Sequence, residues 1–251
     1  GVVDEQEKRE IIESILASHG RELSSGVKDA IVKKRASGYP LYLSMLIQRL
    51  IMMNKQDFDR IVQAGDGMDA ITIHQTKIVE ECGDSAEELS VELIRVAGER
   101  IGGTFAEAAA EYIAVSRYGL RTDDLSGLLG ENFRMLDFAH LVSYMSGSFL
   151  LREDGRYDFA HKSIRSGFLA QCGEPETLYR TLEQYFDTLP DGDEVKDREF
   201  TYFCIMAGDK KRFTECVTRY NRERQVSEIQ LSNAARNLYA TSLADRGAWL
   251  F

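Results

Sequence analysis

Two short stretches of this chain carry side chains that could contact a ligand, and they lie far apart in the sequence. One is Gly38-Tyr39-Pro40, and the other is His161, followed by Lys162 and Arg165. An imidazole at a helix start can donate a hydrogen bond to a phosphate oxygen, and the helix dipole favours an anion there. His161 could therefore contact an anion or only cap its own helix, and the residues alone leave both possibilities open.

Lys162 and Arg165 stand close behind that histidine in the sequence. They are candidates for further phosphate or domain-interface contacts. The alternative interpretation, that both are solvated charges, is open for each.

Pro40 opens a strongly apolar segment that reads as a helix to about residue 54. Proline suits a first helical turn because its φ is already helical and the amide proton it lacks would have no partner there. Gly38 just ahead lets a backbone approach closely. The same residues would also begin an ordinary core helix, so they do not by themselves indicate a ligand contact at Pro40.

The sequence contains none of the common catalytic motifs. It has no G-x-x-x-x-G-K-[ST] phosphate loop, nucleophile elbow, H-E-x-x-H helix or dinucleotide fingerprint. Its carboxylates are scattered over expected helix surfaces, and its four cysteines are far apart with no histidine at metal-ligand spacing. We predict no catalytic activity for this chain alone, no metal, and reduced thiols that pack. We also expect the other histidines to be surface residues or satisfied interface residues: His19, His74 and His140.

Composition narrows the class of protein. The chain has 251 residues, a net charge of −10 and a pI near 5.0, which argues against nucleic acid or an anionic membrane surface as the main partner. No apolar run approaches the roughly 20 residues of a membrane span, and no signal peptide is evident, so a cytoplasmic protein is expected. A start at Gly1, directly before a charged helix, suggests a piece of a larger protein.

The first part of the chain predicts a small helical domain over residues 1–65. Amphipathic patterns with acidic starts and glycine ends indicate its helices. Two connecting helices are expected over residues 66–103, after the Gly65-Asp66-Gly67 break. The expected helices of both parts cover residues 4–18, 26–36, 40–54, 55–64, 70–82 and 86–101.

Residues 104–172 predict a winged helix. A helix over 105–118 ends at Gly119, Thr122 caps a second helix, and a third runs over 132–145. Asp154-Gly155 between two short β-like runs indicates a two-residue hairpin turn, and this is the one strand pair that we expect.

Residues 173–251 predict the beginning of an irregular α-solenoid that is rich in tyrosine and phenylalanine. Its helices are expected at 176–188, 194–207, 209–220 and 224–245. The expected fold class is thus mainly α: a helical domain, a winged helix with one β-hairpin, and a C-terminal helical array.

The two ligand candidates resemble one protein family. The run R-A-S-G-Y-P-L-Y-L-S-M-L-I resembles the G-x-P-L-Y-L helix start of STAND nucleotide-switch ATPases, especially NACHT-type proteins of the nephrocystin-3 and telomerase-associated-protein kind. The run F-A-H-K-S-I-R-S-G-F-L resembles the F-x-H-x-S segment of the family's winged helix. The resemblance implies that Pro40 packs on an adenine and that His161 contacts the β-phosphate of ADP.

The same resemblance implies a regulatory switch module. The family's nucleotide-binding core, with its phosphate loop and magnesium carboxylate, is missing from this sequence. ADP or ATP would therefore be held only together with that core. The C-terminal helices would sense a signal, and nucleotide exchange and oligomer formation would follow, in defence or death-type signalling.

Two other functions stay open. One is a helical scaffold for partner proteins. The other, less favoured, is a winged-helix DNA-binding regulator, whose would-be recognition helix carries Arg134 between Glu131 and Asp137 instead of a basic face.

Overall fold

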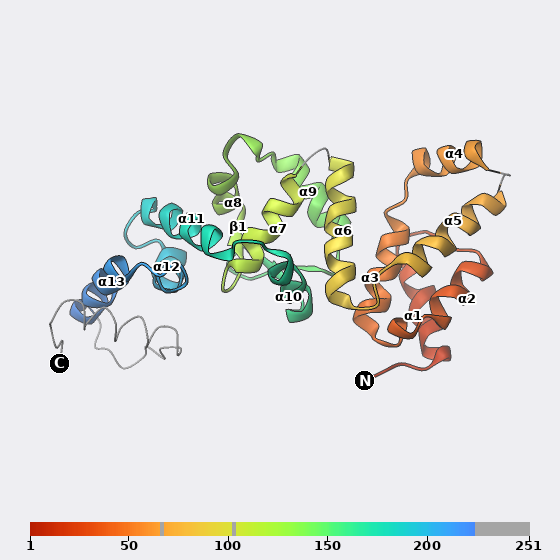
Figure 1. Cartoon of the computed structure of the whole chain (residues 1–251), viewed down its shortest axis with the longest axis horizontal. Helices are drawn as coiled ribbons and strands as arrows, with labels where there is room; N and C mark the ends of the chain where they lie inside the picture. The colour runs from red at the N-terminus through yellow and green to blue at the C-terminus, as the bar shows by residue number, and fades with distance from the viewer. Residues whose placement is uncertain (66–67, 102–103, 224–251) are drawn as a thin grey trace.

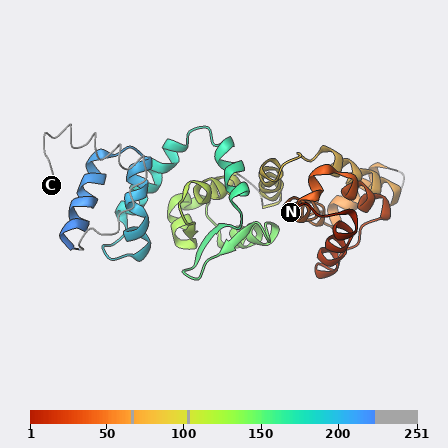
Figure 2. The same ribbon diagram turned by 90° about the horizontal axis from the view of Figure 1, so that it is seen from below.

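The predicted mainly α-helical fold with one small sheet is confirmed. The computed structural model describes residues 1–65, 68–101 and 104–223. Figure 1 shows an elongated row of helices, with the N-terminal helices at one end, a central part that holds the sheet, and the C-terminal helices at the other end. The perpendicular view in Figure 2 shows the same order.

The N-terminal part is built around α3, whose side chains are apolar on most of its circumference. Leu43, Leu46 and Ile47 of this helix are fully buried. The first helix begins at a capping box, in which the Asp4 carboxylate accepts from the Glu7 amide and the Glu7 carboxylate accepts from the Asp4 amide. The helices of this part are α1 (Glu5–Ser18), α2 (Ser25–Lys33), α3 (Pro40–Ile51), α4 (Lys55–Ala64) and α5 (Met68–Glu81).

The second helix is shorter than predicted. It ends at Lys33, and Lys34 is extended with a ψ of 124° before the 3₁₀ turn η1 (Arg35–Gly38). The amide and the hydroxyl of Ser37 both donate to the Lys34 carbonyl oxygen, at 3.2 and 2.6 Å, in place of the bond that a continuing α-helix would have formed.

Helix α6 (Ala86–Ile101) joins the N-terminal and central parts. It packs against α3 on one side and against three helices of the central part on the other. The preceding helix α5 packs with α2, α3 and α4. We predicted α5 and α6 together as connecting helices. In the structure α5 packs within the N-terminal part, whereas α6 contacts both the N-terminal and the central part.

The central part has the helix and strand order of a winged helix, with one strand more than predicted. The short strand β1 pairs with β3, which gives an antiparallel sheet of order β1-β3-β2 in the described residues. Gly119 makes this possible, because its φ is +85° and an added Cβ would lie 2.2 Å from the Tyr157 carbonyl oxygen. The elements are α7 (Phe105–Val115), β1 (Leu120–Arg121), α8 (Thr122–Leu129), η2 (Gly130–Asn132), α9 (Met135–Tyr144), β2 (Phe149–Leu151), β3 (Arg156–Phe159) and α10 (Lys162–Gln171).

The prediction of a two-residue hairpin loop is wrong, because the loop has three residues. The Arg152 amide donates to the Arg156 carbonyl oxygen at 2.8 Å, so three residues, 153–155, form the loop. Gly155 is the last of them and has a φ of +78°. A left-handed glycine that ends a three-residue loop restores the strand pairing by a bulge.

The C-terminal part starts the expected helical array. Helix α11 packs on α12, and α12 packs on α13, while α11 also contacts α7 and α8 of the winged helix. The predicted helix at 224–245 and the breaks at 66–67 and 102–103 lie outside the described residues. The three helices are α11 (Pro175–Thr188), α12 (Glu194–Met206) and α13 (Lys210–Glu223).

Helix α10 approaches α6 closely at Gly167, and this contact yields a stability prediction. A Cβ at Gly167 would lie 2.5 Å from the Glu87 carbonyl oxygen, so Gly167→Ala must push the two helices apart. We expect the free energy of unfolding in urea to fall by about 1–3 kcal/mol.

The matched control is Gly26→Ala in α2, where the added methyl would meet only Thr72 at 3.6 Å. This change should leave stability unchanged or raise it by up to about 1 kcal/mol, because alanine favours helix. Equal effects of the two substitutions would contradict the close packing at Gly167.

Candidate functional site

Pro40 lies at an exposed corner of an otherwise buried helix. It is the first residue of α3, as predicted, and its helix has no side-chain cap. Tyr39 beside it is 59% exposed, although most of the following residues of α3 are buried. A proline and a tyrosine thus present an apolar surface to solvent at this helix start.

We expected a backbone to approach Gly38 closely, and the segment that does so is the start of the chain. The Val3 amide donates to the Gly38 carbonyl oxygen at 2.8 Å, and a Cβ on Gly38 would lie 2.8 Å from a methyl group of Val2. Val2 is itself 68% exposed. Gly38 therefore accommodates the N-terminal segment, and the exposed apolar corner consists of Val2, Tyr39 and Pro40.

His161 caps α10 and keeps one ring nitrogen available. Its Nδ1 accepts a hydrogen bond from the Ser163 backbone amide at 3.1 Å. Because a backbone amide can only donate, Nδ1 carries no proton in this contact, and the proton of the neutral ring is on Nε2. His161 is exposed, and Nε2 has no hydrogen-bond partner among the described residues. The capping role left open by the sequence is thus present, together with a free N–H donor.

The two basic residues behind His161 have different surroundings. Lys162 is the exposed first residue of α10 and forms no ion pair in the part of the chain that the structure describes. The Arg165 guanidinium pairs with the Asp158 carboxylate. It also donates to three carbonyl oxygens at the end of α7, those of Ile113, Ala114 and Ser116.

Arg165 is therefore neither a solvated charge nor a free ligand contact. Helix ends leave carbonyl groups without intrahelical partners, and a guanidinium with several donors can satisfy a set of them. Its role in the structure is to hold α10 to the end of α7, and sequence spacing alone could not reveal this.

A second cluster, which the sequence analysis missed, joins the hairpin to the C-terminal helices. The Arg156 guanidinium lies 3.1 Å from the Glu199 carboxylate of α12 and 2.6 Å from that of Asp154. Arg156 and Glu199 are both buried. The other carboxylate oxygen of Glu199 has no hydrogen-bond partner in the described residues, and burial raises the pKa of this group.

Two further features surround this junction. Arg156 lies with Arg117 and Arg152 around the ring of Tyr118, at 4.7 to 5.8 Å from its centroid. At the start of α12, Arg121 bridges the carboxylates of Asp124 and Asp193, both at 2.8 Å. Arginine–carboxylate pairs therefore connect the winged helix to α12.

The described residues hold no group of three or more His, Cys, Asp or Glu side chains that could bind a metal ion. The same residues include no helix that is long and apolar enough to span a membrane. Burial, followed by the nearby Glu92, raises the pKa of the Cys82 thiol to about 12. A thiol of that kind packs and does not react readily.

Comparisons with protein-family models, with curated proteins and with solved structures give no match for this chain. What the candidate site can do must therefore be argued from its own geometry.

The buried Glu199 carboxyl predicts a pH dependence of stability. Its pKa is raised in the folded state, so the folded protein binds this proton more tightly than the unfolded chain does. The group's contribution to stability is then lost as the pH rises from the unfolded value of about 4.3 through the raised folded value. We expect the difference in unfolding free energy, wild type minus Glu199→Gln, to fall across this window in urea titrations.

The other carboxylates titrate equally in the wild type and in Glu199→Gln, so their contributions cancel in this difference. A difference that is constant with pH, or that grows as the pH rises, would contradict the assigned cause.

Proposed function

We propose that this chain is the regulatory module of a STAND-type nucleotide switch, which closes over ADP held mainly by a nucleotide-binding core outside this sequence. The observation that carries the proposal is the state of His161, which is exposed and held in one tautomer with its Nε2–H free. A neutral imidazole in this state is a ready donor for a phosphate oxygen.

The surroundings of His161 suit an anion. Lys162 follows it at the exposed start of α10, and the N-terminus of this ten-residue helix adds a favourable dipole. Arg165 is occupied within the winged helix and is not part of the proposed contact. The His161 and Lys162 side chains and the helix dipole would bind ADP only weakly by themselves. The nucleotide-binding core must therefore supply most of the affinity.

The apolar corner of Val2, Tyr39 and Pro40 would contact the adenine. The ring of a purine packs well on a proline and an aromatic side chain that are already exposed and rigid. The N-terminal segment lies against Gly38, so a core joined ahead of Gly1 would reach this corner directly. Helices α3 and α10 both pack on α6, which would hold the two contacts in a fixed relation in the closed state.

The C-terminal helices would receive the signal. They are joined to the hairpin and to β1 through the Arg156–Glu199 and Arg121–Asp193 pairs. A partner that binds these helices only in an open arrangement would favour release of the winged helix, nucleotide exchange and oligomer formation. Such a shift requires the partner to bind the two arrangements with different affinity. The buried thiols of Cys82 and Cys204 suit a reducing compartment, and we place the protein in the cytoplasm.

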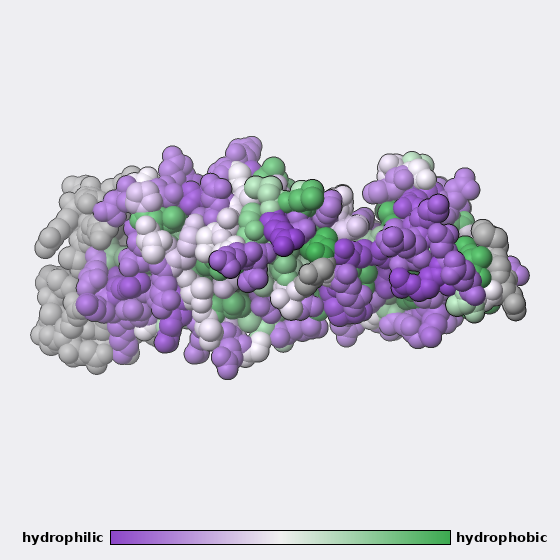
Figure 3. Space-filling model, turned by 90° about the horizontal axis from the view of Figure 1, so that it is seen from above, coloured by the Kyte–Doolittle hydropathy of each residue, from purple (hydrophilic) through white to green (hydrophobic). Residues whose placement is uncertain are grey.

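A scaffold for partner proteins is the second candidate, and exposed apolar residues of the winged helix favour it. Helix α9, which would read DNA in a winged-helix regulator, exposes Met135 and Leu136 by 60% and 66%, and β2 exposes Leu150 and Leu151. Figure 3 shows apolar side chains gathered over the middle of the molecule. An apolar surface of this kind suits a protein partner and not a nucleic acid.

The switch proposal predicts the effect of removing the free imidazole donor. In a protein that joins this chain to its nucleotide-binding core, His161→Ala should weaken ADP binding by about 1–3 kcal/mol, the value of a charge-assisted hydrogen bond. The measurement is calorimetric titration with ADP, and His140→Ala is the matched control, since His140 is also an exposed histidine of the winged helix. Equal ADP affinity in the two variants would remove His161 from the proposed site.

The apolar α9 surface predicts that duplex DNA does not bind. In an electrophoretic shift assay at about 0.1 M salt, we expect no retardation of mixed-sequence duplex, because α9 presents exposed apolar side chains where a reading helix needs basic ones. A shift that weakens steeply as salt is raised would favour the DNA-binding regulator instead.

A further inference from the structure

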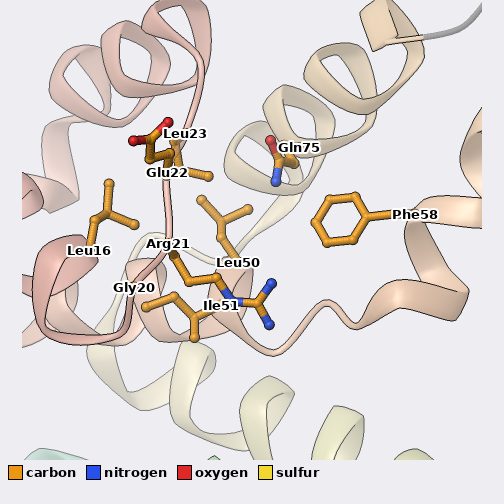
Figure 4. Close-up of a pocket in the computed structure, with 9 residues that line it drawn as sticks. All are labelled: Leu16, Gly20, Arg21, Glu22, Leu23, Leu50, Ile51, Phe58 and Gln75. Atoms are coloured by element: carbon orange, nitrogen blue, oxygen red, sulfur yellow. The ribbon is translucent and has the colours of Figure 1, made fainter.

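A pocket on the N-terminal part has the chemistry of a small-molecule site. It lies between the α1–α2 turn, the end of α3, α4 and α5, as Figure 4 shows, and its volume is about 360 Å³. This volume falls within the range of ligand pockets in proteins. We call it the Gln75 pocket, and its apolar walls are formed by Leu16, Leu23, Leu50, Ile51 and Phe58.

Gln75 is a buried polar side chain whose hydrogen-bonding capacity is largely unused. It is 5% exposed, and its amide nitrogen reaches only the Met53 sulfur at 4.0 Å. Its carbonyl oxygen has no hydrogen-bond partner among the described residues. Figure 4 shows the carboxamide directed into the pocket from α5. A carboxamide offers both a donor and an acceptor, so a ligand amide would satisfy both at once.

Arg21 places a positive charge at the rim of the same pocket. Its guanidinium makes one long hydrogen bond, to the Met53 carbonyl oxygen at 3.4 Å, and forms no ion pair among the described residues. Figure 4 shows Arg21 extending towards the pocket interior, while the carboxylate of the neighbouring Glu22 points away. The planar fork of the Arg21 guanidinium matches a carboxylate.

The apolar wall opposite the arginine can adapt to a ligand. Phe58 projects into the pocket from α4, and its ring is half-buried. Helix α4 has no fully buried residue and packs mainly on α5. The turn on the other side is shaped by Gly20, whose φ is +59°. An apolar side chain between Phe58 and the leucines would bury surface on both partners.

We propose that the Gln75 pocket binds an N-acylated amino acid unit with an apolar side chain and a free carboxylate. Arg21 binds the carboxylate, the Gln75 carboxamide pairs with the ligand amide, and the apolar walls take the side chain. A simple fatty acid would leave Gln75 unpaired, and a phosphate, which carries more negative charge than a carboxylate, would find only one cation. The unit can be a free molecule or the C-terminal residue of a peptide, because both present the same groups.

This site is separate from the proposed nucleotide contacts. Leu50 and Ile51 lie at the end of α3, and Pro40 lies at its start, about 15 Å away along a helix of this length. The inference does not rest on the switch function, and either can fail without the other.

The test is titration of the whole 251-residue chain with N-acetyl-L-phenylalanine, followed by two-dimensional NMR. We expect a dissociation constant on the order of 0.1–1 mM, with shifts concentrated at the Gln75 side-chain amide and the residues of the pocket. N-acetyl-phenylalaninamide, which lacks the carboxylate, and 3-phenylpropionate, which lacks the amide, should each bind about tenfold or more weakly.

Two variants assign the roles, with circular dichroism to verify folding. Arg21→Met should weaken the acid about tenfold or more and leave the amide analogue unchanged, whereas Arg9→Met, an exposed arginine of the same part, should have no effect. Gln75→Met should weaken both ligands that carry an amide. Because Arg21 is exposed, its variant remains informative even if the Gln75 variant fails to fold.

A further titration identifies the source of the ligand. A short peptide that ends in phenylalanine with a free carboxylate is compared with N-acetyl-L-phenylalanine: tighter binding of the peptide indicates a peptide terminus, and equal binding indicates a free metabolite. The proposal is overturned if no pocket resonance shifts up to about tenfold above the expected dissociation constant, or if Arg21→Met binds the acid as well as the wild type does.

Discussion

The close packing of α10 on α6 at Gly167 is the constraint on which the arrangement of the candidate site depends. A glycine there lets the helix that carries His161 lie directly against the backbone of α6. The opposite side of α6 packs on α3, the helix that begins with Pro40. Leu89 and Leu93 of α6 are fully buried, so this junction is apolar and well packed. The two proposed nucleotide contacts are thereby carried by helices with a common rigid partner.

The junction on the other side of the winged helix combines apolar packing with ion pairs. There, Arg156 and Glu199 form a buried ion pair, and Arg121 bridges to Asp193 at the start of α12. Desolvation offsets much of the attraction in such pairs, and breaking one leaves a buried charge. These pairs add to the apolar packing of α11 on α7 and α8, where Leu182 and Phe186 are fully buried. This junction suits the place where the proposed switch would respond to a partner.

The sequence predicted the helices well where caps and periodicity agree, as in α4 and α6, whose bounds match the prediction to the residue. It missed β1, because a two-residue strand has no periodicity and exists only through pairing with β3. No sequence pattern marks Glu199 or Gln75, since the burial of both is decided by distant elements. The sequence motif identified His161 as a candidate. Its tautomer could not be predicted, because it depends on the hydrogen bond that Nδ1 accepts from the Ser163 amide.

The most direct test of the switch proposal is a structure of the ADP-bound protein that contains both this chain and its nucleotide-binding core. The account predicts the Nε2 atom of His161 at about 2.7–3.2 Å from a β-phosphate oxygen, with Pro40 packed on the adenine. A nucleotide bound entirely within the core, with His161 still facing solvent, would contradict the central claim.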